Sequence, residues 1–186
     1  MRIISGYLKS KKINYLRNSI TRPLKDSVRE NIFNILKHSN LIDVKIEKSN
    51  ILDLYSGVGS FGIECISRGA KKVSFIEKDI NTFKILKENL VHLSIIEKSN
   101  LFNNDISDTL KKEFREKYNI FFFDPPYLDK DFVENLKIIK TKNIFYKNHI
   151  IIIHREKKTN DNFENLINII DEKIYGRSKV LFGLFD

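Results

Sequence analysis

Residues 53–62, DLYSGVGSFG, restrict the fold of this chain more than any other stretch. Gly57, Gly59 and Gly62 are spaced as G-x-G-x-x-G, between a short apolar strand pattern and a helix pattern. Glycines at this spacing let the backbone turn tightly and let a ligand approach it closely. We therefore expect an α/β protein whose glycine turn binds a nucleotide-like ligand. The alternative is a tight strand-to-helix turn that binds nothing.

From residue 50 onwards, apolar strand patterns alternate with amphipathic helix patterns. Strands are predicted over 50–56, 71–79, 100–105, 119–127 and 149–156, and helices over 60–70, 80–93, 106–118, 130–139 and 160–170. Residues 172–186 predict two strands joined by a glycine-containing turn. Nearly continuous apolar strands that alternate with helices indicate a mostly parallel sheet with helices on both faces. The closing hairpin adds an antiparallel strand at the C-terminal end.

The first residues of the chain are strongly basic. Residues 1–20 alternate apolar and basic side chains without a single acid, and Gly6 is a candidate for a turn. They predict a short basic hairpin or arm ahead of a helix over 21–39, with Asp26 in its first turn. The whole chain carries a formal net charge of +9. Such a charge points to a polyanionic partner, most often nucleic acid, although a Lys-rich composition can also serve solubility.

The cysteine content and the hydropathy of the sequence indicate the cellular compartment. Cys65 is the single cysteine, so no internal disulfide can form, which suits a reducing compartment. It lies on an apolar helical stretch, and we expect it to fill the core. The sequence has no visible signal peptide and no apolar run as long as a membrane span. We therefore expect a cytoplasmic protein without a membrane partner.

Two acidic residues flank the glycine turn and bear on what it binds. Glu77 ends the next predicted strand, twenty positions after Gly57, where a carboxylate can accept hydrogen bonds from ribose hydroxyls. Asp53 lies on the strand just before the turn. A carboxylate there opposes the pyrophosphate of a nicotinamide or flavin cofactor, but it suits the ammonium group of S-adenosylmethionine. The G-x-x-x-x-G-K-[ST] motif is absent from the sequence, so a P-loop nucleotide site is not expected.

A second motif follows the fourth predicted strand. Asp124-Pro125-Pro126-Tyr127 stops that strand, because proline removes a backbone donor. The motif reaches the same sheet edge as the glycine turn, where open α/β sheets bind their ligands. A plain strand stop is the simpler interpretation. Together with the glycine turn, however, the motif resembles that of amino-methyltransferases that use S-adenosylmethionine.

That resemblance gives the proline motif a chemical role. An exocyclic purine amine is a poor nucleophile, because its lone pair is delocalised into the ring. Two acceptors, the Asp124 carboxylate and the Pro125 carbonyl, favour a pyramidal nitrogen whose lone pair points at the methyl group. Tyr127 can stack on the base after it leaves its helix. The reaction depends on positioning and electrostatics, so no metal is expected.

The N-terminal third narrows the family further. The segments RIISG at 2–6, RP..D..RE..F across 22–33, FIEKD at 75–79 and the Tyr175-Gly176 pair join the two motifs above, and together the chain resembles the RsmD family. This resemblance implies a class I methyltransferase fold with a seven-stranded sheet. It also implies S-adenosylmethionine-dependent methylation of the N2 amine of a guanine in 16S ribosomal RNA, by a monomer acting on rRNA or the small subunit. The boundary falls after residue 24, giving a basic arm over 1–24 and the methyltransferase domain over 25–186.

The resemblance also assigns residues to roles. Those expected to hold S-adenosylmethionine are Asp53, Tyr55, Gly57, Gly59, Glu77, Lys78 and Asp105. Those expected to hold the target guanine are Asp124, Pro125, Pro126 and Tyr127. Those expected to meet RNA phosphates, or to order the loop over the cofactor, are Arg2, Lys9, Lys11, Lys12, Arg22 and Arg29. For the arginines, a solvated basic face or salt bridges to Asp26 and Glu30 are the alternative.

Some residues depart from the family pattern, and other functions stay open. Ser10 replaces a common glycine, and Leu24-Lys25 replace a common Thr-Thr, which bears on the shape of the arm. His154 stands where a small or apolar residue is usual, and we expect it at the sheet edge without a catalytic role. The alternatives are a DNA or RNA adenine-N6 methyltransferase, a glutamine methyltransferase acting on protein, and a non-catalytic RNA-binding module that keeps the fold.

Overall fold

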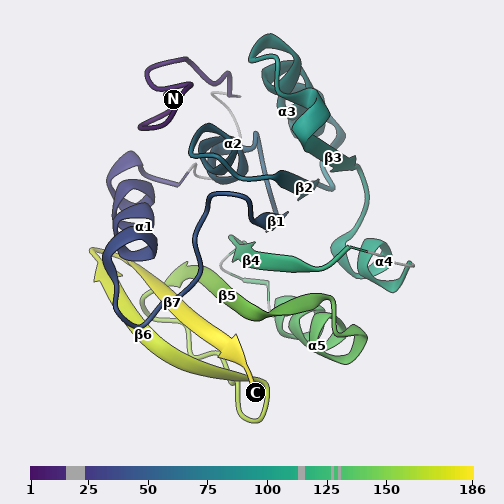
Figure 1. Ribbon diagram of the computed structural model, residues 1–186. Coiled ribbons are helices and arrows are strands. Elements are labelled where there is room, and N and C mark those ends of the chain that lie inside the picture. Colours follow the sequence, from purple (N-terminus) through teal and green to yellow (C-terminus); the bar gives the residue numbers. More distant parts are fainter. Residues whose placement is uncertain (16–23, 113–115, 127, 130) are drawn as a thin grey trace.

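Seven strands form one sheet in the order β3-β2-β1-β4-β5-β7-β6 (Figure 1). The computed structural model describes residues 1–15, 24–112, 116–126, 128–129 and 131–186. The strands are β1 (Asn50–Leu54), β2 (Lys72–Ile76), β3 (Ser99–Phe102), β4 (Tyr118–Phe123), β5 (Phe145–Glu156), β6 (Ile167–Tyr175) and β7 (Ser178–Phe185). Strands β1 to β5 pair in parallel, and β7 runs antiparallel to both β5 and β6. The predicted fold class is therefore confirmed.

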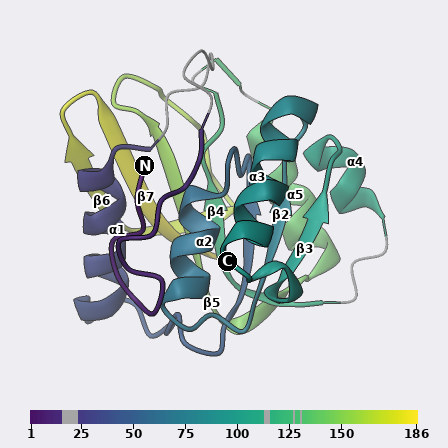
Figure 2. The ribbon, with the colours of Figure 1, turned by 90° about the horizontal axis from the view of Figure 1, so that it is seen from above.

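Helices cover both faces of the sheet. The helices are α1 (Asp26–His38), α2 (Ser60–Ser67), α3 (Ile80–His92), the single 3-10 turn η1 (Ile96–Lys98), α4 (Ile106–Lys111) and α5 (Phe132–Lys142). Apolar residues of α1, α2 and α3 share one buried cluster, and those of α4 and α5 share a second cluster on the opposite face (Figures 1 and 2). Among the described helices, none has both the length and the apolar character to cross a bilayer.

The central strands are buried on both faces, as a parallel sheet between helices requires. Residues 150–153 of β5 are four consecutive isoleucines with no exposed surface. They alternate between the two apolar clusters, so one strand contributes to both cores. Cys65 of α2 is likewise fully buried, which confirms its predicted place in the core.

The start of the chain folds as the predicted hairpin and packs on α2. Arg2 and Lys12 form an antiparallel bridge, and the chain reverses near Gly6, which has a φ of +83°. A Cβ atom on Gly6 would lie 1.9 Å from the carbonyl oxygen of Ser67, so both the backbone angle and the contact require glycine. The side chains of Ile3 and Leu8 are buried in the same cluster as α1 to α3.

The helix predicted over 160–170 is wrong. Strand β6 begins at Ile167, and a turn occupies the residues just before it. In β6, Ile167 is buried, Asn168 is exposed and Ile169 is half-buried, the alternation of a strand that covers a core on one side. The pairing of β6 with β7 therefore outweighs the helical spacing of the apolar residues in this segment. Helix α4 is also shorter than the predicted 106–118, and β5 begins earlier than predicted.

Candidate active site

The glycine turn and the proline motif leave neighbouring strands at one edge of the sheet. Leu54 at the end of β1 pairs with Phe123 at the end of β4, and with Ile76 at the end of β2. The segments that follow these three ends carry the glycine turn, Asp124 and Glu77. The predicted meeting of the two motifs at one edge is thus present in the structure.

The glycine turn has the backbone geometry that its sequence requires. Tyr55, Gly57 and Gly59 have φ values of +60°, +55° and +87°. A Cβ atom on Gly59 would lie 2.5 Å from Leu86 of α3, so that glycine lets the turn pack against the helix. A Cβ atom on Gly57 would have nothing within 4 Å, so the turn is open at this point. This is a place where a ligand can approach the backbone.

Asp53 is a buried carboxylate with one oxygen bonded and the other without a partner. Its Oδ2 accepts a hydrogen bond from the amide of Gly62 at 3.0 Å, and the residue is 1% exposed. Its Oδ1 is buried and has no hydrogen-bond partner among the described residues. Burial raises the pKa of Asp53, with smaller contributions from the charges of Asp124 and Glu77. A cationic group at Oδ1 would compensate the burial of this carboxylate.

Glu77 ties the glycine turn to the end of β2. Its Oε2 accepts a hydrogen bond from the amide of Gly57 at 2.8 Å, and its Oε1 accepts one from the amide of Asp79 at 2.8 Å. Burial raises the pKa of Glu77, although both hydrogen bonds oppose that rise. Each carboxylate oxygen has a further lone pair, so Glu77 can also accept hydrogen bonds from ligand hydroxyls.

Three other residues predicted to bind the cofactor surround this edge. The phenol of Tyr55 accepts a hydrogen bond from Nδ2 of Asn135 at 3.2 Å. Burial is the largest cause of the raised pKa of Tyr55. Lys78 Nζ lies 3.3 Å from Oδ2 of Asp105, which also caps α4 through the Ser107 amide. The Lys78–Asp105 pair is largely exposed to solvent.

The proline motif is held by β5, the strand next to β4. Oδ1 of Asp124 lies 2.7 Å from Nδ1 of His154, and the Asp124 side chain is 25% exposed. The carbonyl of Pro126 accepts hydrogen bonds from Nη1 of Arg155 at 3.0 Å and from the Asp129 amide at 2.9 Å. Tyr127 lies outside the described residues.

Arg155 is fully buried and anchored by an acid. Its Nε lies 3.0 Å from Oδ2 of Asp161, and its Nη2 lies 3.1 Å from Oδ1 of the same carboxylate. The guanidinium also lies over the ring of Phe132 in α5, 4.6 Å from the centroid. This bidentate geometry fixes the direction of the Nη1 that bonds Pro126.

The sequence did not indicate the roles of His154 and Arg155. His154 was expected at the sheet edge, apart from the chemistry, yet its ring contacts Asp124 in the structure. Parallel pairing of Phe123 with Ile153 brings the next residues of the two strands together. The contact between His154 and Asp124 follows from this β4–β5 register, which the sequence alone does not give.

The basic residues predicted to meet RNA are not all exposed. The exposed ones are Arg2, Lys9, Lys11 and Lys12. Arg22 lies outside the described residues. Arg29 is fully buried, and its Nη2 donates to the Arg2 carbonyl at 2.6 Å and to Asp26 Oδ1 at 2.9 Å. In this structure the Arg29 guanidinium is buried and ion-paired with Asp26, one of the two acids of the salt-bridge alternative.

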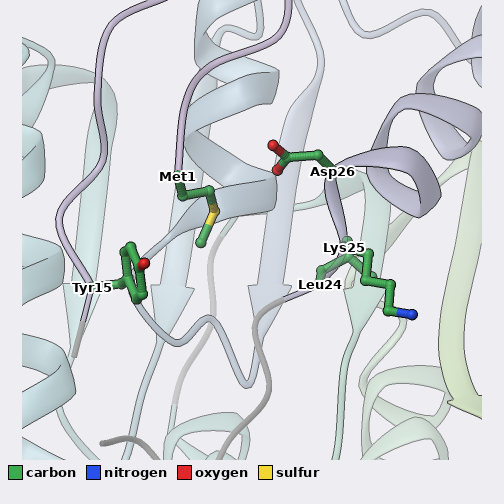
Figure 3. A pocket seen from close by; sticks show the side chains of 5 residues that line it. All are labelled: Met1, Tyr15, Leu24, Lys25 and Asp26. Carbon is green, nitrogen blue, oxygen red and sulfur yellow. The ribbon is translucent and has the colours of Figure 1, made fainter. Parts of the chain in front are cut away.

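A pocket of about 240 Å³ lies between the arm and the start of α1. The residues lining it are Met1, Tyr15, Leu24, Lys25 and Asp26 (Figure 3). None of them belongs to the glycine turn or the proline motif. In the described part of the chain, His, Cys, Asp and Glu side chains form no group of three or more suited to a metal.

Comparisons with known proteins show which family the chain matches. A family model described as Conserved hypothetical protein 95 matches residues 1–183. The ribosomal RNA small subunit methyltransferase D of Buchnera aphidicola from Acyrthosiphon pisum is 35% identical over 161 residues, covering 84% of this chain and 78% of the relative. The protein of the same name from the Baizongia pistaciae symbiont is 31% identical over 185 residues, covering 100% of this chain and 91% of the relative.

Solved structures share this fold. The putative methylase HI0767 of Haemophilus influenzae superposes with a TM-score of 0.78 at 28% identity, over 100% of this chain and 98% of that one. The fold also matches the putative methyltransferase SMU.776, solved in complex with SAH, with a TM-score of 0.63 at 14% identity. That match covers 84% of this chain and 49% of the other.

Proposed function

This chain belongs to the RsmD family of ribosomal RNA methyltransferases, and we propose that it methylates the exocyclic N2 amine of a guanine in 16S ribosomal RNA. S-adenosylmethionine-dependent methylation of ribosomal RNA is the activity that its relatives support. The 16S target and the guanine N2 position are the finer part of the proposal. Action as a monomer in the cytoplasm stays a prediction.

The residues at the glycine turn fit S-adenosylmethionine. The buried Oδ1 of Asp53 has no partner among the described residues, and it would accept a hydrogen bond from the cofactor's ammonium group. Gly57 leaves the turn open, and Glu77 beside it would accept from the ribose hydroxyls. When bound, S-adenosylmethionine supplies a methyl group on a positively charged sulfur. Tyr55, Lys78 and Asp105 are proposed to line the remainder of this site.

The position of Asp124 carries the proposal. Asp124 directly follows the end of β4, beside the β1 end that carries the glycine turn, and its charge raises the pKa of buried Asp53. A target amine bound by Asp124 would therefore lie close to the methyl donor. Asp124 and the Pro125 carbonyl would accept its two hydrogens, so that its lone pair faces the methyl group.

The exposed basic residues of the arm support an RNA substrate. Arg2, Lys9, Lys11 and Lys12 lie on a segment without acids, in a chain with a net charge of +9. Phosphate contacts of this kind position a nucleic acid without reading its sequence. The choice of base is then left to the proline corner, which we define as Asp124, Pro125, Pro126 and Tyr127.

Methyl transfer to several substrates in parallel tests the proposal. Purified protein and tritiated S-adenosylmethionine are incubated with small ribosomal subunits, naked rRNA and DNA, and the products are digested to nucleosides. We expect label in N2-methylguanosine from rRNA or subunits. Label in N6-methyladenine, or in protein glutamine, would instead support the alternative methyltransferases.

The Asp124→Ala variant separates catalysis from cofactor binding. We expect methyl transfer to fall by about a hundredfold or more, because the substrate amine loses an acceptor. The affinity for S-adenosylmethionine, measured by calorimetry, should stay within a few fold. Wild-type rates in this variant would remove the role given to Asp124. Failure of the wild-type protein to bind S-adenosylmethionine would favour the RNA-binding module.

A further inference from the structure

We propose that the end of β5 is a clamp that positions the proline corner, with His154 holding Asp124 and Arg155 holding Pro126. The inference rests on the proposed function, because it concerns the geometry in which the substrate amine is bound. Neither side chain is assigned a contact with substrate. Both are positioning residues that act through the corner.

His154 fixes one oxygen of Asp124. An ionised carboxylate only accepts hydrogen bonds, so the 2.7 Å contact requires the proton on Nδ1 of His154. This bond occupies Oδ1 and leaves Oδ2 for the substrate amine. The His154 side chain is 8% exposed and that of Asp124 is 25% exposed, so the imidazole is the more deeply buried of the two partners. From there it can set the orientation of Asp124 without touching the base.

Arg155 fixes the backbone on the far side of the corner. Its Nη1 donates to the Pro126 carbonyl, and its other nitrogens are held by both oxygens of Asp161. Contact with the Phe132 ring adds a third restraint on the guanidinium. The clamp therefore acts one residue beyond the Pro125 carbonyl, the acceptor we assign to the amine.

The two side chains act from opposite faces of the sheet. Ile152 packs in the cluster of α1 to α3, and Ile153 packs in the cluster of α4 and α5. Strand alternation continues this pattern, so His154 lies on the first face and Arg155 on the second. The contact of Arg155 with Phe132 in α5 agrees with that placement. The contacts of His154 and Arg155 therefore restrain the proline corner from both faces of the sheet.

Holding the corner matters because amine attack depends on alignment. A displacement of about 1 Å in a positioned group can cost about a hundredfold in rate. Loss of the clamp should therefore lower kcat, while the affinity for S-adenosylmethionine is set by the glycine turn and should not change. A residue needed only for folding would lower both properties together with stability.

Paired variants test the histidine. His154→Leu removes the donor to Asp124, whereas His154→Asn places an amide N–H where Nδ1 was; of the two ring nitrogens it loses Nε2, which has no partner among the described residues. We expect kcat to fall tenfold or more in His154→Leu and to stay within about threefold in His154→Asn. His38→Asn, on the exposed end of α1, is the control and should match wild type. Equal kcat in His154→Leu and wild type would overturn the role of His154.

A second pair tests the arginine. Arg155→Lys keeps the charge but loses the bidentate pairing with Asp161. Arg68→Lys is its matched control, because Arg68 also pairs with a carboxylate, Glu64, and lies over a ring, that of Phe33, away from the corner. We expect kcat to fall tenfold or more only in Arg155→Lys, with cofactor affinity unchanged in both variants. Similar losses in both would indicate a general effect of replacing an arginine that pairs with a carboxylate and lies over a ring.

A nuclear magnetic resonance measurement tests the hydrogen bond between His154 and Asp124 without an activity assay. The imidazole 15N signals of His154 should report a proton on Nδ1 in the wild type, and they should shift in Asp124→Ala. A proton on Nε2 alone would overturn the proposed hydrogen bond. If the wild-type protein methylates no RNA, the proposed function fails, and this signal still decides whether His154 holds Asp124.

Discussion

Glu77 accepts a hydrogen bond from the amide of Gly57 across 2.8 Å, which joins the end of β2 to the glycine turn that follows β1. The same carboxylate accepts a second hydrogen bond from the Asp79 amide just after β2. The Glu77 side chain thus holds the backbone of the turn and, in our proposal, also accepts hydrogen bonds from the ribose hydroxyls. Its loss should disturb the cofactor site in both ways.

Replacing Glu77 with alanine should weaken S-adenosylmethionine binding. Hydrogen bonds to a charged group contribute about 1.5–3 kcal/mol each, so we expect the Kd to rise roughly tenfold or more. Isothermal titration calorimetry measures the change. Glu88→Ala, on the exposed side of α3, is the control and should bind as wild type does. An unchanged Kd in Glu77→Ala would show that the carboxylate does not contact the cofactor.

Removing the arm lysines should reduce the salt dependence of RNA binding. Each phosphate contact contributes about 0.7 to 0.9 to the slope of log K against log salt, so a triple alanine variant of Lys9, Lys11 and Lys12 should lower its magnitude by about 2. The matched control replaces exposed Lys45, Lys117 and Lys147, which precede or begin β1, β4 and β5 at the opposite sheet edge. It removes the same charge. Equal slopes in the two variants would assign the effect to net charge and not to the arm.

Arg29 should matter for stability and not for RNA contact. Its guanidinium is buried, bonded to the Arg2 carbonyl, and paired with Asp26, which is 54% exposed. We expect Arg29→Ala to lower the free energy of unfolding by about 2–3 kcal/mol, mostly from the lost charge-assisted hydrogen bonds, since the exposed Asp26 is readily solvated. Urea unfolding measures this loss. Arg2→Ala, at an exposed side chain, should change stability by less than about 0.5 kcal/mol.

Stability should fall in mild acid through His149. Its Nδ1 donates to the Tyr146 carbonyl at 2.9 Å, and its Nε2 accepts from the Phe185 amide at 2.9 Å, a pattern that only the neutral ring can make. Burial lowers the pKa of His149 below 6.5 in the folded chain. The unfolded chain therefore takes up the proton first, and this stability is present above about pH 6.5 and lost as the pH falls below it.

Unfolding measured between pH 8 and pH 5 checks this expectation. His149→Phe keeps the ring packing against Phe145 and Phe185 but removes the titrating group, so its stability should depend less on pH. His92→Asn, at an exposed position, should keep the wild-type dependence. A His149→Phe variant with the full acid dependence would place its cause in other groups.

Features that depend on a strand end were predictable from the sequence. The glycine turn, Glu77 and Asp124 each directly follow an apolar strand, and parallel strands bring such ends to one edge. The hairpin at Gly6 was predictable too, because basic and apolar residues alternate on both sides of a glycine. Local pattern alone was sufficient in these cases.

Features that depend on neighbouring strands were not predictable. The helix expected over 160–170 has apolar residues at helical spacing, namely Phe163, Leu166, Ile167 and Ile170, yet pairing with β7 makes a strand of the last two. The contact of His154 with Asp124 needs the β4–β5 register. The burial of Arg29 needs the arm to fold back over α1, which its charge alone did not suggest.

Helix α2 sets the distance between the two binding regions assigned above. It begins directly after the glycine turn (Figure 1). Its Glu64 and Ser67 side chains accept hydrogen bonds from the backbone amides of Ile4, Ser5 and Leu8 in the arm. Eight helical residues span about 12 Å, so α2 has the proposed cofactor site at its N-terminal end and the proposed RNA-binding arm along its side. One residue inserted within it, before Glu64, would turn the arm by about 100° around the helix axis and away from its present position relative to the glycine turn.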